Sequence, residues 1–130
     1  MRQFDVSVVL PAKNEAKNLS ALLLEISEVV PNATTEIIVV DDGSSDESLS
    51  LLRNLSSTLP VSCRVIFHPM SCGQSTSVFH GVLLAKGKWI ITLDADGQND
   101  PADIPRLIRA ATETNAAHFC VIGHRKKRKD

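Results

Sequence analysis

Short apolar runs that alternate with segments of helical periodicity constrain this fold more than any other feature of the chain. The apolar runs are rich in branched residues and occupy positions 6–10, 36–40, 61–67, 89–93 and 117–122. Between them, apolar residues recur every three or four positions, which predicts helices over 19–30, 49–55, 78–85 and 104–111. This alternation predicts an α/β fold, a three-layer sandwich in which a mostly parallel sheet carries helices on both faces.

Length and composition fit one domain over residues 1–130. A hydrophobic content of 43% with 22% charged residues is ordinary for a globular protein. The net charge of -1 argues against a nucleic-acid binder, which normally carries a basic surplus.

The cysteines and the apolar runs bear on localisation. Three cysteines without a C-x-x-C pair fit a reducing compartment. No apolar run reaches the roughly 18 residues of a membrane span. We therefore expect a cytoplasmic protein that binds no nucleic acid.

Three polar clusters follow three of the predicted strands. P-A-K-N-E occupies positions 11–15, D-D-G-S-S positions 41–45, and D-A-D-G-Q positions 94–98. The carboxyl ends of parallel strands lie at one edge of a sheet, and the ligands of such sheets bind outside that edge. The clusters therefore predict a single binding site.

Asp94 and Asp96 predict a divalent metal site within that edge. Hard cations such as Mg²⁺ and Mn²⁺ take oxygen ligands and often connect a carboxylate to substrate phosphates. The alternative is a solvated turn whose acids cap a helix. An EF-hand loop beginning at Asp94 is excluded, because it needs Gly at its sixth position and Glu at its twelfth, where Asn99 and Pro105 stand.

The polar residues of the other two clusters can be interpreted either as ligand contacts or as helix caps. One of the two acids Asp41 and Asp42 is suited to accept hydrogen bonds from a nucleobase or a ribose. Ser44 has the spacing to Glu47 of a capping box, and Asn14 fits a helix cap. Both interpretations stay open at this point.

The remaining polar residues favour structural roles. Asp100 before Pro101 indicates a helix cap followed by a first-turn residue. The segment that begins at Gly73 is either a phosphate-binding helix start or a turn of small residues. The histidines are scattered without ligand spacing, which favours surface or packed positions. The basic run at 125–129 indicates a solvated terminus or an anion-binding segment.

Together the clusters resemble glycosyltransferase family 2 and its GT-A fold. The resemblance is carried by V-V-L-P-A-K-N-E at 8–15, E-I-I-V-V-D-D-G-S-S-D at 36–46, G-Q-S-T-S-V-F-H-G at 73–81 and W-I-I-T-L-D-A-D-G-Q-N-D-P at 89–101. The closing V-I-G-H-R-K-K-R-K-D at 121–130 is similar to the branch of dolichol-phosphate mannosyltransferases and undecaprenyl-phosphate sugar transferases. Members of the family are longer, so the resemblance covers their N-terminal, donor-binding part.

The resemblance implies a role for each matching residue. Five residues match contacts to the nucleoside: Pro11, Ala12, Glu15, Val40 and Asp42. Four match the metal and diphosphate site, with Asp94 and Asp96 as the metal-binding pair and Ala95 and Gln98 along the diphosphate. Arg125 and Arg128 match arginines of the polyprenyl-phosphate branch, and Arg125 joins the two acids as a catalytic residue.

A reaction follows from the same resemblance. It is the metal-dependent, inverting transfer of a sugar from a nucleoside-diphosphate sugar to a polyprenyl phosphate, of the undecaprenyl or dolichyl type, with Mg²⁺ or Mn²⁺ as cofactor. A lipid-phosphate acceptor implies a peripheral position at the inner face of the membrane.

The last predicted strand would be left uncovered at the edge of the sheet. Such a strand favours pairing with another copy of the chain, which predicts a homo-oligomer.

Three other functions fit parts of the sequence. A receiver-like signalling domain has a similar size, but it needs paired acids after the first strand, where P-A-K-N-E stands. A phosphatase with a D-x-D nucleophile places the pair after its first strand, whereas here it follows the fourth. A non-catalytic nucleotide-sugar-binding fragment fits every cluster, and it would bind the donor without transferring the sugar.

Overall fold

A computed structural model describes residues 4–96 and 100–113 of the chain. Its elements are β1 (Phe4–Ala12), α1 (Ala16–Val29), β2 (Thr35–Asp42), α2 (Ser48–Thr58), β3 (Ser62–His68), α3 (Gln74–Leu84), β4 (Gly87–Thr92), the 3-10 turn η1 (Pro101–Asp103) and α4 (Ile104–Thr112). The four strands have the order β3-β2-β1-β4, and every neighbouring pair is parallel. The predicted α/β fold is confirmed, while the strand predicted at 117–122 lies outside the described residues.

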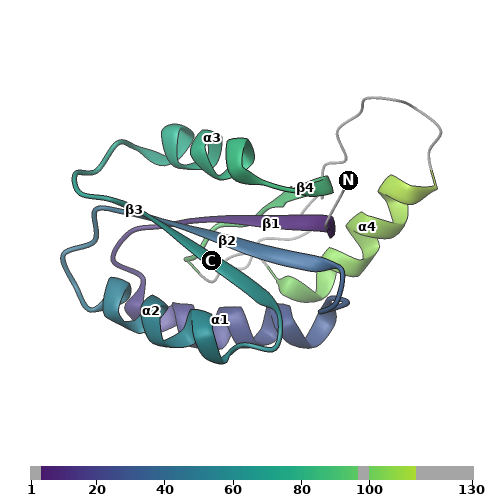
Figure 1. The fold of residues 1–130 in the computed structure, drawn as a ribbon, viewed down its shortest axis with the longest axis horizontal. Coiled ribbons are helices and arrows are strands. Elements are labelled where there is room, and N and C mark those ends of the chain that lie inside the picture. Colours follow the sequence, from purple (N-terminus) through teal and green to yellow (C-terminus); the bar gives the residue numbers. More distant parts are fainter. Residues whose placement is uncertain (1–3, 97–99, 114–130) are drawn as a thin grey trace, which may run out of the picture.

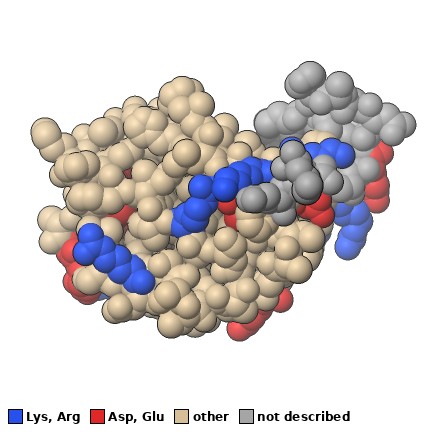
Figure 2. Space-filling model, in the orientation of Figure 1, with Lys and Arg blue, Asp and Glu red and all other residues tan. Residues whose placement is uncertain are grey.

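Helices cover both faces of the sheet, which confirms the predicted three layers (Figure 1). α1 and α2 lie side by side on one face, and α3 is the one helix of the described residues on the other. The outer side of α3 is apolar, with Phe79 and Leu83 exposed, and Figure 2 shows few charged side chains over this helix. Among the described residues, no helix is both long and apolar enough to cross a membrane.

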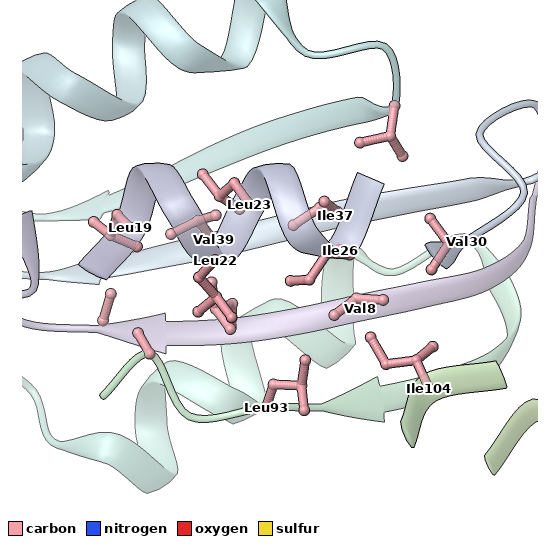
Figure 3. Close-up of a cluster of buried hydrophobic side chains, with 14 of the residues drawn as sticks. Val8, Leu19, Leu22, Leu23, Ile26, Val30, Ile37, Val39, Leu93 and Ile104 are labelled. Atoms are coloured by element: carbon pink, nitrogen blue, oxygen red, sulfur yellow. The ribbon is translucent and has the colours of Figure 1, made fainter. Parts of the chain in front are cut away.

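The core between the sheet and α1 forms because the apolar face of the helix meets the two central strands. The leucines and isoleucine of that face recur at helical spacing and pack against alternate residues of β1 and β2 (Figure 3). The cluster includes Val8, Leu19, Leu22, Leu23, Ile26, Ile37 and Val39. Each such side chain stabilises the fold by roughly 1.5–3 kcal/mol on burial, so the central strands are held firmly.

On the opposite face, α3 approaches the sheet closely at Gly81. A Cβ atom added there would lie 2.4 Å from Cγ1 of Val9 and 3.3 Å from Cγ2 of Val40. Glycine is therefore required for this contact, because any side chain would push the helix away from β1 and β2. The contact fixes the height of α3 above the strands and brings its first turn to the carboxyl edge of the sheet.

Candidate functional site

The strand register brings the polar clusters to one edge of the sheet. Ala12 of β1 lies opposite Asp41 of β2, and Asp42 lies opposite His68 of β3. β4 ends at Thr92, shortly before the third cluster. Since all four strands are parallel, these ends lie together, and the first turn of α3 lies beside them.

Asp42 is buried at this edge and accepts four hydrogen bonds. Its Oδ1 accepts from Nδ1 of His68 at 2.8 Å and from the backbone N of Cys72 at 2.7 Å. Its Oδ2 accepts from Oγ of Ser71 at 2.9 Å and from the backbone N of Gly73 at 3.0 Å. Burial opposes the charged form, but these hydrogen bonds outweigh it and hold the pKa of Asp42 well below its ordinary range. The ionised carboxylate thus fixes the loop that precedes α3.

A second histidine extends this arrangement into α3. Nε2 of His68 and Nδ1 of His80 are 2.8 Å apart, and the two rings are nearly perpendicular at 84°. An ionised carboxylate can only accept, so Nδ1 of His68 carries the proton shared with Asp42. With a neutral ring, Nε2 of His68 then accepts from Nδ1–H of His80. Asp42, His68 and His80 form a hydrogen-bonded chain from β2 through β3 to α3.

Asn14 and Ser44 join the loops that follow β1 and β2. Asn14 has a left-handed backbone, with φ of 54°, and its Oδ1 accepts from the backbone N of Ser45 at 2.8 Å and of Asp46 at 3.3 Å. Oγ of Ser44 accepts from the backbone N of Asn14 at 2.9 Å and donates to Oδ1 of Asp41 at 2.5 Å. The predicted capping roles of Asn14 and Ser44 are wrong, because the N-cap residues are Glu15 for α1 and Glu47 for α2. The carboxylate of Asp46 instead accepts from the first backbone N of each helix, at 3.3 Å for Ala16 and 2.9 Å for Ser48.

Asp41 differs from its neighbour Asp42 in its surroundings. Successive strand residues point to opposite faces, so Asp41 faces the α1 side of the sheet and Asp42 the α3 side. Asp41 is fully buried, and its Oδ2 has no hydrogen-bond partner among the described residues. A buried carboxylate oxygen without a partner is costly. It marks a position at the edge where a donor from a ligand or from water would be stabilising.

Asp94 and Asp96 flank the buried Ala95 just after β4. Asp94 is half-buried and accepts a hydrogen bond from Nε2 of Gln74 at 2.9 Å, whereas Asp96 is exposed. Two carboxylates at this spacing supply oxygen ligands, the donor type that Mg²⁺ and Mn²⁺ prefer, so these residues fit such a cation.

Gln74 connects the two acidic parts of the edge. It is the first residue of α3 and follows Gly73, whose backbone N is held by Asp42. Its side chain holds Asp94. Gln74 therefore connects Asp94 to the loop that the carboxylate of Asp42 holds.

The other predicted site residues differ in how accessible they are. Pro11 and Glu15 are half-buried, and Glu15 accepts from Nδ2 of Asn18 at 2.8 Å. Ala12 is buried, and Val40 is fully buried beneath α3 next to the position of Gly81. The remaining three, Gln98, Arg125 and Arg128, lie outside the described residues.

His68 and His80 belong to this edge, although their spacing in the sequence gave no indication of it. They lie on different elements, and their contact depends on the height of α3 above β3. A signal did exist for His68, because it ends an apolar run, and the end of a parallel strand lies at the carboxyl edge. The predicted strand stopped at residue 67, one residue short of it.

The fold and this edge together define a parallel α/β domain with polar clusters at the carboxyl ends of its strands. Residues 7–130 match the model of the family described as "Glycosyl transferase family 2". The chain belongs to glycosyl transferase family 2.

The curated relatives are sugar transferases that are much longer than this chain. The chain is 38% identical over 110 residues to the undecaprenyl-phosphate 4-deoxy-4-formamido-L-arabinose transferase of Aeromonas hydrophila subsp. hydrophila, covering 83% of this chain and 34% of that protein. It is 41% identical over 111 residues to the protein of the same name from Serratia proteamaculans, with the same coverage of 83% and 34%. The chain therefore spans about a third of the length of these relatives.

Solved structures agree with the fold. S. aureus TarS 1-349 superposes with a TM-score of 0.70 at 22% identity, covering 84% of this chain and 32% of that one. The mannosyltransferase PcManGT from Pyrobaculum calidifontis, in complex with GDP-Man and Mn²⁺, gives a TM-score of 0.69 at 26% identity, covering 75% and 29%. The fold is thus of the GT-A type that the resemblance implied.

Proposed function

We propose that this chain is the donor-binding part of a glycosyltransferase that moves a sugar from a nucleoside diphosphate to a polyprenyl phosphate. The observation that carries the proposal is the connection through Gln74 between the loop held by Asp42 and the acids after β4. A nucleoside-diphosphate sugar has a nucleoside and a charged diphosphate joined at a fixed distance. The loop held by Asp42 and the acids after β4 are connected through Gln74, so they lie at a defined separation that suits such a ligand.

The roles assigned to the nucleoside contacts follow from the position of each residue. Pro11 and Glu15 are accessible from the edge, so they are suited to contact the base or ribose. Ala12 and Val40 are buried and would shape the floor of the site. Asp42 would act on the nucleoside partly through the loop that it orders.

Asp94 and Asp96 would hold Mg²⁺ or Mn²⁺ beside the diphosphate. The bound cation supplies Lewis-acid stabilisation of the negative charge that grows on the leaving diphosphate. Gln74 orients Asp94 for this role, and Ala95 keeps the segment anchored in the core between the two acids. Gln98, Arg125 and Arg128 would complete the anion site, because amide and guanidinium groups donate to phosphate oxygens.

The acceptor phosphate would attack the anomeric carbon while the diphosphate leaves. A single displacement of this kind inverts the configuration at that carbon. A lipid phosphate is already anionic near neutral pH, so no residue is assigned as a general base. The acceptor places the working enzyme at a membrane surface, where the basic run at 125–129 would meet anionic headgroups. Self-association of the chain also stays a prediction.

A second candidate function is nucleotide-sugar binding without transfer. It is favoured by the described residues assigned to the site, from Pro11 to Asp96, all of which would contact the donor. Positioning a second substrate supplies roughly 7–11 kcal/mol of a barrier, so transfer needs an acceptor site as well as a donor site.

Thermal-shift measurements with UDP, GDP and their sugars, each with and without Mn²⁺, test donor binding. Asp96→Ala should remove the metal-dependent stabilisation, whereas Asp42→Ala should weaken nucleoside binding even without metal. Equal losses under both conditions would contradict this division of roles. A transfer assay with labelled donor and polyprenyl phosphate then separates the transferase from the binding domain.

A further inference from the structure

We propose that Asp42, His68 and Cys72 form a second cation site, selective for Zn²⁺ and separate from the Asp94 and Asp96 pair. The cation site itself does not rest on the proposed function. It rests on three ligand types brought together from β2, β3 and the loop before α3. One ligand atom from each residue lies within 4.8 Å of the other two.

The three residues supply a ligand set that distinguishes between cations. A thiolate and an imidazole are ligands of Zn²⁺, whereas Mg²⁺ takes oxygen ligands and retains water. Asp42 and His68 are buried and Cys72 is exposed, so the site has a fixed floor and an open side. A cation can therefore enter from solvent and keep one coordination position for water.

Only a small local change is needed to admit the cation. Nδ1 of His68 and Oδ1 of Asp42 are 2.8 Å apart, while two such ligands on tetrahedral Zn²⁺ are roughly 3.3 Å apart, from metal–ligand lengths near 2.0–2.1 Å. The Sγ of Cys72 donates to the backbone O of Met70 at 3.3 Å, and rotation of this exposed side chain releases it. The three remaining hydrogen bonds to Asp42 keep its carboxylate in place.

His80 acts as the positioning residue of this site. A histidine that ligates a metal through one nitrogen usually donates its other N–H to a neighbouring group. Here Nε2 of His68 lies 2.8 Å from Nδ1 of His80. When Zn²⁺ replaces the proton on Nδ1 of His68, that ring carries its proton on Nε2 and donates it to His80, whose own proton moves to its Nε2. The thiol proton of Cys72 passes to solvent.

Occupation of this site would regulate the neighbouring nucleotide site. Zn²⁺ would occupy Oδ1 of Asp42, whose carboxylate the loop before α3 already holds, and so withdraw this oxygen from a nucleoside. This consequence rests on the proposed function. Zn²⁺ at one equivalent should then weaken UDP or GDP binding by about tenfold or more, even with Mg²⁺ in excess.

Absorption spectroscopy with Co²⁺ in place of Zn²⁺ tests the site directly, in excess Mg²⁺ and in a reducing buffer. The chain should bind one Co²⁺ with a thiolate-to-cobalt charge-transfer band, and Zn²⁺ should remove the band. Cys72→Ser should abolish it without unfolding the protein, because the residue is exposed. Cys63→Ser and Cys120→Ser are the matched controls and should keep it. Burial raises the pKa of the Cys63 thiol to about 11, so that thiol stays protonated.

Further variants separate the site from an adventitious thiol and from the proposed function. His80→Ala should weaken Zn²⁺ binding by about 10–100-fold, as loss of a group that orients a ligand does. Asp96→Ala should leave the cobalt spectrum unchanged, even where it abolishes Mn²⁺-dependent nucleotide binding. Absence of the band, its survival in Cys72→Ser, or unaltered affinity in His80→Ala would overturn the proposal.

Discussion

The strand β2 carries a buried carboxylate at each end, and the two are built differently. Glu36 lies at the amino end and Asp42 at the carboxyl end, and their even spacing places both on the face covered by α3. Glu36 accepts from the backbone N of Lys86 at 2.6 Å, just after α3, and Asp42 accepts from the backbone N of Gly73 at 3.0 Å, just before it. Each carboxylate therefore holds one end of the same helix.

The difference lies in what compensates the two charges. Glu36 accepts from Arg64, a permanent cation, at 2.9 Å, and Arg64 also donates to the backbone O of Leu84 at 2.6 Å. Oγ of Ser7 donates to Glu36 at 2.6 Å, which completes a closed structural network. Asp42 has a histidine and the donors of an exposed loop instead. A buried carboxylate thus anchors each end of α3. At the end near Lys86 its partner is a permanent cation, and at the end where the site lies its partners are a histidine and an exposed loop.

The largest effect is expected from Glu36→Ala. The variant leaves the Arg64 guanidinium without its carboxylate and the donors of Ser7 and Lys86 without an acceptor. Breaking a buried ion pair costs 3–5 kcal/mol, and because Arg64 is partly exposed we expect about 3 kcal/mol here. Urea unfolding measures this loss, and Glu28→Ala, at an exposed carboxylate of α1, is the control. A loss similar to that of the control would mean that Arg64 does not depend on Glu36.

Gly81→Ala tests whether the middle of α3 is as tightly held as its ends. The added Cβ would lie 2.4 Å from Cγ1 of Val9, so the helix must move away from the sheet. Overpacking of this kind typically costs about 1–3 kcal/mol. Leu83→Ala, on the exposed side of the same helix, should change the free energy of unfolding much less. Equal effects would show that α3 adapts its height freely.

The pH dependence of stability tests whether Asp42 is ionised at the carboxyl end of β2. The folded-state pKa of Asp42 lies below its unfolded value, so the stabilisation from this group is fully present above about pH 4 and is lost as the pH falls further. Asp42→Asn lacks this contribution, worth about 1.5–3 kcal/mol for hydrogen bonds to a charged group. Urea unfolding of both proteins from neutral pH downward should show the difference shrinking below about pH 4. A constant difference would contradict an ionised Asp42.

The central strands and the layers were predictable because burial on both faces leaves a continuous apolar run in the sequence. The start of α3 was not, since the predicted helix began at Val78 and the observed one begins at Gln74. Ser75, Thr76 and Ser77 have the composition of a loop. Ser77 is nevertheless buried in the helix, where its Oγ donates to the backbone O of Gly73 at 2.9 Å.

The candidate site was predictable in outline and not in its contacts. The rule that ligands bind at the carboxyl ends of parallel strands located the edge, and the helix cap predicted at Asp100 is confirmed by its bond from the backbone N of Ala102 at 3.0 Å. The hydrogen bonds among Asp42, His68 and His80 join elements distant in the sequence. The distance of α3 from the sheet determines which of these side chains meet, and no local sequence pattern predicts that distance.

Gln74→Ala is expected to have the smallest effect on stability. It is also the sharpest test of whether the start of α3 connects Asp94 to the loop held by Asp42. The lost hydrogen bond to Asp94 is exposed, so the free energy of unfolding should fall by only about 0.5–1 kcal/mol. Nucleotide binding with Mn²⁺ should weaken by up to about tenfold, the equivalent of 1.4 kcal/mol, because Asp94 loses one of the contacts that orient it. Binding of the nucleoside without metal should be unchanged, and Ser75→Ala, one residue further along α3, should alter neither. Calorimetric titration with and without Mn²⁺ measures both affinities. If the two fall together in Gln74→Ala, the first turn of α3 orders the whole edge at once, and the separate roles assigned to Asp42 and Asp94 are wrong.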